Sequence, residues 1–148
     1  MGRWTMLALA LSLVAGPASA RDFIVRTAGA ATALAVDRSS VRQTGHFRTG
    51  WTYEFYRERN PLYGERTQIA AVLELVDCTT LRSRHLKIVH YLEDGRVLAR
   101  FGPERAWTED LHGSNTDLEL MALCGETGSD WATRKADTVF DLYRRVWG

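Results

Sequence analysis

The clearest hydrophobic pattern in the chain is a strict alternation over residues 47–56. Four aromatic residues and one threonine fill the odd positions, which are Phe47, Thr49, Trp51, Tyr53 and Phe55. Because successive side chains of a strand point to opposite faces, this period of two is typical of an antiparallel strand with one face in the core. We therefore expect a strand here, with Trp51, Tyr53 and Phe55 in the core.

Further segments with strand character surround this one. They are residues 31–37, 67–78, 82–92 and 97–101, and Trp107 is expected in another short strand. The tetrapeptide Glu93-Asp94-Gly95-Arg96 predicts a tight hairpin, because Asp-Gly tolerates the positive φ values of such a turn. The pattern predicts a meander of about five to six antiparallel strands.

The period of the apolar positions changes near the C-terminus. Ser114 can cap a helix that Gly125 ends, with Leu118, Met121 and Ala122 as its apolar stripe. A second helix is expected over residues 130–147, capped by Ser129 or Asp130, and its stripe is Ala136, Val139, Phe140, Tyr143 and Trp147. The stripe must be covered either by this protein's own sheet or by a partner or second copy. The expected fold class is α+β, an antiparallel sheet with one or two C-terminal helices packed on it.

The first twenty residues have the layout of a secretory signal peptide. Arg3 precedes an apolar run from Met6 to Val14, and Ala18-Ser19-Ala20 forms a small-x-small cleavage site. The run is shorter than the ~20 residues of a membrane-spanning helix. We expect cleavage after Ala20, which leaves residues 21–148 as one domain that is periplasmic or secreted. No later segment is long and apolar enough to span a bilayer, and no cysteine at the cleavage site could carry a lipid anchor.

Charge and cysteine content narrow the classes of partner. The 148-residue chain has 19 Lys and Arg against 18 Asp and Glu, a formal net charge of +1. Dedicated nucleic-acid binders are normally basic, so nucleic acid is not an expected partner. Cys78 and Cys124 are the two cysteines, and export favours a disulfide. A metal-ligand pair and a catalytic thiol are the alternatives, although the sequence has no Cys-x-x-Cys motif.

Residues that could carry catalysis are few and scattered. His85 and His90 lie an odd number of positions apart, so they point to opposite faces of one strand unless a bulge intervenes. Glu54 and Glu58 share a strand face and resemble a solvated surface. The sequence has neither a Gly-x-Ser-x-Gly elbow nor a Gly-rich phosphate loop. We therefore predict no catalytic residue, no cofactor and no metal site.

Tyrosine and arginine side chains gather around one loop. They are Tyr56, Arg57, Arg59, Tyr63 and Arg66. Both residue types are enriched at binding hot spots. We take this group as a candidate binding surface for a protein partner, and a plain solvated surface is the alternative.

Several short motifs occur in a fixed order along the chain. They are Val36-Asp37-Arg38-Ser39-Ser40-Val41, a strand with Trp51, a strand end at Val76-Asp77-Cys78, Tyr91 followed by Asp94-Gly95-Arg96-Val97, then Trp107, and a capped segment from Ser114 to Cys124. This ordered set covers about residues 34–125 and resembles the surface-adhesin protein E family of Gram-negative envelope proteins.

The resemblance implies a non-enzymatic envelope protein with a helix packed across an antiparallel sheet and a Cys78–Cys124 disulfide. The family's namesake binds host vitronectin, laminin and plasminogen, so a protein partner, by analogy a host extracellular-matrix protein, is expected. The matching residues are structural and transfer no ligand site. The alternative is a small periplasmic enzyme or enzyme inhibitor, which a cleft with His90 or His112 beside a carboxylate would favour. Whether the protein dimerises stays open.

Signal-peptide cleavage gives the first testable prediction. The intact mass of the exported protein should correspond to a chain that begins at Arg21, and both cysteines should resist alkylation under non-reducing, denaturing conditions. A mass that retains residues 1–20, or alkylation of both thiols, would contradict the corresponding part of the prediction.

Overall fold

The computed structural model describes residues 19–62, 65–109 and 112–148, and nine strands in these residues form one sheet. The strands are β1 (Arg21–Thr27), β2 (Thr32–Asp37), β3 (Arg42–Thr44), β4 (Phe47–Leu62), β5 (Glu65–Asp77), β6 (Arg82–Tyr91), β7 (Val97–Phe101), β8 (Thr108–Glu109) and β9 (Ala132–Ala136). The helices are α1 (Asn115–Leu123) and α2 (Val139–Trp147), and a 3₁₀ turn, η1, spans Arg38–Ser40. None of the described helices is long and apolar enough to cross a membrane.

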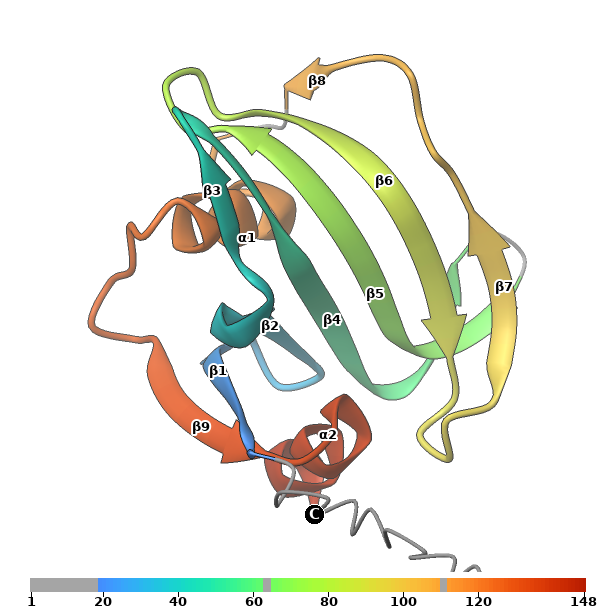
Figure 1. Cartoon of the computed structure of the whole chain (residues 1–148). Helices are drawn as coiled ribbons and strands as arrows, with labels where there is room; N and C mark the ends of the chain where they lie inside the picture. The colour runs from blue at the N-terminus through green and yellow to red at the C-terminus, as the bar shows by residue number, and fades with distance from the viewer. Residues whose placement is uncertain (1–18, 63–64, 110–111) are drawn as a thin grey trace, which may run out of the picture.

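The sheet runs in the order β7-β6-β5-β4-β2-β1-β9, with β3 paired to β4 and β8 paired to β6. Its strand pairs are antiparallel. Figure 1 shows a strongly curved sheet with α2 close to the end where β9 meets β1. The predicted α+β class is confirmed, and β4 to β7 form the expected meander. The sheet exceeds the expected five to six strands because β1, β3 and β9 also join it.

One face of the sheet and α2 together form the first core. Its buried members are Phe23, Val25, Ala33, Ala35, Tyr53, Phe55, Ile69, Ala71, Ala136, Val139, Leu142 and Tyr143. Tyr53 and Phe55 are buried as the alternation of β4 predicts, whereas Trp51 is half-buried and packs at the border of this core. The second helix therefore packs on the protein's own sheet, as the intramolecular alternative required.

The opposite face of the sheet and α1 form a second core. Its buried members are Ile24, Val36, Val76, Leu120, Ala122 and Leu123. Phe23 and Ile24 are neighbours in β1 and enter different cores, because alternate strand residues point to opposite faces. The two helices thus cover opposite faces of one sheet.

The prediction of a helix over residues 130–147 is wrong in its first half. Residues 132–136 form strand β9, which pairs with β1 so that Ala136 lies opposite Arg21. The helix begins only after Thr138, whose side chain accepts a hydrogen bond from the backbone N–H of Asp141. Ala136 is buried in the first core as expected, but it reaches that core from a strand.

The first helix has its predicted cap and end, but the predicted stripe is wrong in part. Ala122 is buried, whereas Leu118 and Met121 are half-buried, and Leu120 and Leu123 fill the second core instead. Ser114 caps α1 by accepting a hydrogen bond from the N–H of Asp117, at 3.1 Å. Gly125 follows the helix with φ of +92°, a conformation that glycine adopts without steric cost.

Packing of α2 on the sheet leads to a stability prediction. Leu142 is fully buried in the first core, so Leu142→Ala should lower the free energy of unfolding by about 2–5 kcal/mol. Lys135→Ala, an exposed change on β9, is the matched control and should cost less than about 0.5 kcal/mol. Denaturant titration measures both changes. Equal midpoints for the two variants would show that α2 contributes no packing energy.

Candidate functional site

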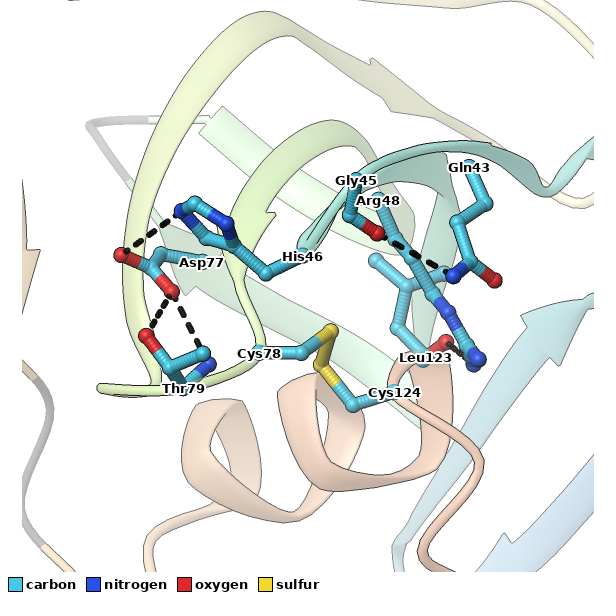
Figure 2. The surroundings of a disulfide bond; sticks show 9 residues. All are labelled: Gln43, Gly45, His46, Arg48, Asp77, Cys78, Thr79, Leu123 and Cys124. Atoms are coloured by element: carbon cyan, nitrogen blue, oxygen red, sulfur yellow. Dashed lines mark hydrogen bonds and ion pairs between the residues drawn. A yellow bond between two sulfur atoms is a disulfide. The ribbon is translucent and has the colours of Figure 1, made fainter.

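The disulfide predicted between the two cysteines is confirmed. Cys78 directly follows β5 and Cys124 directly follows α1, and their Cα atoms lie 5.6 Å apart across a sequence separation of 46. Figure 2 shows the bond joining the end of the helix to the end of the strand. The two cysteines thereby fix α1 against the sheet and serve neither as metal ligands nor as a catalytic thiol.

Polar contacts hold the chain on both sides of the disulfide. Asp77 accepts hydrogen bonds from the backbone N–H and hydroxyl of Thr79, at 2.9 and 2.6 Å, and Nε2 of His46 lies 3.9 Å from its carboxylate (Figure 2). The bonds from Thr79 are the main reason that the pKa of Asp77 lies below its usual value. These contacts stabilise the turn after β5, and we assign them a structural role.

A groove of about 480 Å³ lies beside the disulfide and has two arginines in its lining, Arg38 and Arg48. Nη1 of Arg48 donates a hydrogen bond to the carbonyl oxygen of Leu123 at 3.0 Å, so it satisfies the end of α1 (Figure 2). Arg38 lies 3.9 Å from the carboxylate of Asp22. We therefore assign Arg48 a structural role at the end of α1.

A smaller cavity lies between the sheet and α1, and several charged or titratable residues line it. It measures about 150 Å³, and its charged or titratable lining residues are Glu54, Glu74, His85, His90 and Glu119. Glu74 and His90 are each 1% exposed and Glu119 is 4% exposed. We call this space the polar cavity.

The polar cavity corrects the expectation that His85 and His90 point to opposite faces. The register passes from Leu73 opposite Lys87 to Glu74 opposite His85, so Leu86 is an extra residue in β6. This bulge turns both imidazoles to the face that α1 covers. His85 then lies between two carboxylates, 3.4 Å from Glu74 and 3.1 Å from Glu104.

Metal chemistry has no support in this cluster. Within the part of the chain that the structure describes, no group of three or more His, Cys, Asp or Glu side chains is arranged to hold a metal ion. His112 lies 3.2 Å from the carboxylate of Asp117, but its side chain is 92% exposed.

The half of the sheet that α2 leaves uncovered forms a second candidate site. Cross-strand pairing places Leu73 between Trp51 and Lys87, and Leu75 between Thr49 and Arg84. The rings of Phe47 and Trp107 lie 5.9 Å apart, and the guanidinium of Arg84 lies 5.5 Å from the Trp107 ring. We call this surface the open sheet face, and it comprises Phe47, Leu73, Leu75, Arg84, Lys87 and Trp107.

Partial burial distinguishes the open sheet face from both cores. Lys87 is exposed, and the other five side chains are half-buried. A contiguous strip of aromatic and aliphatic groups with cations at its edge is the usual composition of a protein-binding surface. Phe47 shares a strand face with the core residues Tyr53 and Phe55, but the alternation reveals only which residues share a face and not where the covering helix ends.

The predicted surface of Tyr56, Arg57, Arg59, Tyr63 and Arg66 is only partly assembled by the fold. Arg57, Arg59 and Arg66 are exposed, and Tyr63 lies outside the described residues. Tyr56 is 6% exposed, its hydroxyl donates a hydrogen bond to Glu54, and its carbonyl accepts one from Tyr143 at 2.8 Å. Tyr56 therefore has a structural role, and three arginines of the predicted surface are available to a partner.

Comparison with known proteins identifies one family whose match spans the features described above. The model of the surface-adhesin protein E family matches residues 24–125. This range includes both cysteines, the open sheet face, the polar cavity and α1, whereas β9 and α2 lie beyond it. No curated protein and no solved structure matches the chain.

The disulfide generates a prediction that is independent of any partner. Closing a loop of this length contributes about 4 kcal/mol in the chain-entropy model, so the double substitution Cys78→Ser and Cys124→Ser should lower the free energy of unfolding by about that amount. Urea titration with and without a reductant provides the measurement. Reductant should destabilise the natural protein to a similar extent and leave the double variant unchanged; a natural protein insensitive to reduction would refute the role assigned to the bond.

Proposed function

Because the chain belongs to the surface-adhesin protein E family, we propose that it is an exported, non-enzymatic binding protein of the cell envelope whose protein partner docks on the open sheet face. The observation that carries the proposal is the uncovered strip of apolar side chains beside α2. A host extracellular-matrix protein is the partner that the family assignment favours.

Two observations support export. Strand β1 begins at Arg21, which is the residue expected to be first after cleavage behind Ala20, so cleavage there would keep every described strand and helix. The Cys78–Cys124 disulfide also requires an oxidising compartment to persist. We therefore place the mature protein in the periplasm or outside the cell.

Charge on the open sheet face indicates the character of the partner. Lys87 and Arg84 carry positive charge at its border, and Lys87 is exposed. Opposite charges across an interface favour association and suppress wrong partners. The partner surface should accordingly present acidic side chains around an apolar centre. The exposed Arg57, Arg59 and Arg66 form a second proposed contact surface for an acidic partner.

The alternative of a small periplasmic enzyme or enzyme inhibitor draws on the polar cavity, where His85 and His90 lie beside carboxylates. Its volume of about 150 Å³ argues against this alternative, because pockets for small-molecule substrates usually measure about 300–1,000 Å³. We assign the polar cavity to the structure of the layer beneath α1.

Binding measurements with charge-reversed variants test the proposal. The exported protein should bind one or more of immobilised vitronectin, laminin and plasminogen, and Lys87→Glu should weaken that binding about tenfold, or about 1.4 kcal/mol. Lys135→Glu is the matched control, because Lys135 is also an exposed lysine on a strand but lies on β9. Biolayer interferometry gives the dissociation constants.

The pattern of losses decides between the two surfaces. If Arg57→Glu with Arg59→Glu abolishes binding while Lys87→Glu leaves it intact, the arginine surface replaces the open sheet face as the docking site. If the substitutions on neither surface weaken binding, or if the natural protein binds none of the three ligands, the proposed function is overturned.

A further inference from the structure

A pocket of about 350 Å³ opens where α2 begins, on the same face of the sheet as the first core. Its volume lies within the usual range of small-molecule sites. The side chains that determine its chemistry are Arg21, Trp51, Tyr53, Ala71, Tyr91 and Phe140. We call it the aromatic pocket. Trp51 stands at its border with the open sheet face, but the other five residues do not belong to that face.

Aromatic rings form two walls of the aromatic pocket. Trp51 and Tyr53 are stacked with their centroids 6.3 Å apart, and Tyr91 meets Phe140 of α2 edge-on at 5.4 Å. Ala71 lies opposite Tyr53 in the sheet and is 1% exposed. Because Ala71 has only a methyl group, it leaves the space between the rings unfilled. A flat apolar group fits this geometry, since aromatic rings pack well against the faces and edges of other rings.

Arg21 gives the aromatic pocket a cationic group with hydrogen-bond donors that the protein leaves unused. Its Nη2 atom donates hydrogen bonds to the buried carboxylate of Asp37 and to the hydroxyl of Tyr53, the latter at 3.4 Å. Its Cζ atom lies 5.4 Å from the centroid of the Phe23 ring. Within the described part of the chain, both side-chain hydrogen bonds of Arg21 come from Nη2. Since a guanidinium has five N–H donors, Nε and Nη1 keep donors for a ligand.

The tyrosine beside Arg21 adds no competing charge. Burial raises the pKa of Tyr53 to about 12, against the opposing attraction of Arg21, so its hydroxyl is neutral at physiological pH. Arg21 is always cationic in this range. Asp37 is buried and is occupied by Nη2 of Arg21. The polar end of the pocket can therefore donate hydrogen bonds to an acceptor through Nε and Nη1 of Arg21.

We propose that the aromatic pocket binds a small organic anion that combines a flat apolar body with one carboxylate. The body packs between Trp51, Tyr91 and Phe140, and the carboxylate accepts charge-assisted hydrogen bonds from Arg21. This site is separate from the open sheet face and does not depend on the proposed protein partner.

Three matched probes test the proposal on the exported protein with its disulfide intact. They are 3-phenylpropionate, 3-phenylpropan-1-ol and 3-phenylpropan-1-amine, which share one apolar body and differ in charge. Isothermal titration calorimetry should give at least tenfold tighter binding for the carboxylate than for either other probe. The indole N–H signal of Trp51, assigned with Trp51→Phe, should shift on titration in NMR spectra.

Substitutions in the aromatic pocket test whether the probes bind there. Ala71→Val narrows the floor of the pocket and should weaken the binding of 3-phenylpropionate at least fivefold. Arg21→Gln should remove the preference for the carboxylate, and Arg21→Lys, which keeps a cation beside Asp37, should retain the preference with weaker binding. Arg26→Gln is the control, because Arg26 also lies on β1 but pairs with Asp130 outside this pocket.

Specific results would overturn the proposal. Equal affinity for the three probes would exclude recognition of the anion. An Ala71→Val variant that folds and binds as the natural protein does would exclude the pocket. Should Arg21→Gln fail to fold because Asp37 loses its partner, Arg21→Lys and Ala71→Val still decide the outcome. These results leave the partner measurements unaffected, because none of them alters Lys87.

Discussion

Apolar residues on both faces of the sheet require a cover on both faces, and this requirement accounts for most of the architecture. In β1 the neighbours Phe23 and Ile24 enter different cores, so neither face can be left to solvent at this point. α2 covers one face and α1 the other. Each helix has nine residues, and the Cys78–Cys124 bond holds α1 in place from its C-terminal end.

The limited length of α2 creates the surfaces to which we assign function. A nine-residue helix covers the first core but not the part of the same face that carries Leu73 and Leu75. That part becomes the open sheet face, and the border between the covered and uncovered parts becomes the aromatic pocket. On the other face, α1 buries Leu120 and Leu123 in the second core, and its Glu119 lies with Glu74 and His90 of the sheet around the polar cavity. Both proposed binding surfaces thus lie on the face that α2 covers in part.

Local signals in the sequence predicted the part of the fold that depends on near neighbours. The alternation in β4, the Asp94-Gly95 turn and the cap at Ser114 each act within a few residues, and each appears in the structure. β9 was missed because Ala-Thr-Arg-Lys-Ala has little strand character of its own, and its extended form depends on pairing with β1 more than 100 positions earlier. The helix prediction extended across β9 because Ala136 also falls at helical spacing from Val139 and Phe140.

The sequence alone determined the antiparallel α+β class, the single cysteine pair and the family. These features depend on composition and on local motifs, which can be recognised without knowledge of the tertiary structure. Tertiary structure alone decided which of the candidate side chains are buried and which share a face. Tyr56 became buried through its contacts with Glu54 and Tyr143, and the extra residue Leu86 brought His85 and His90 to one face. The burial of a side chain and the sheet face to which it points depend on strand register and on which distant element covers that face. A local sequence pattern encodes neither the register nor the covering element.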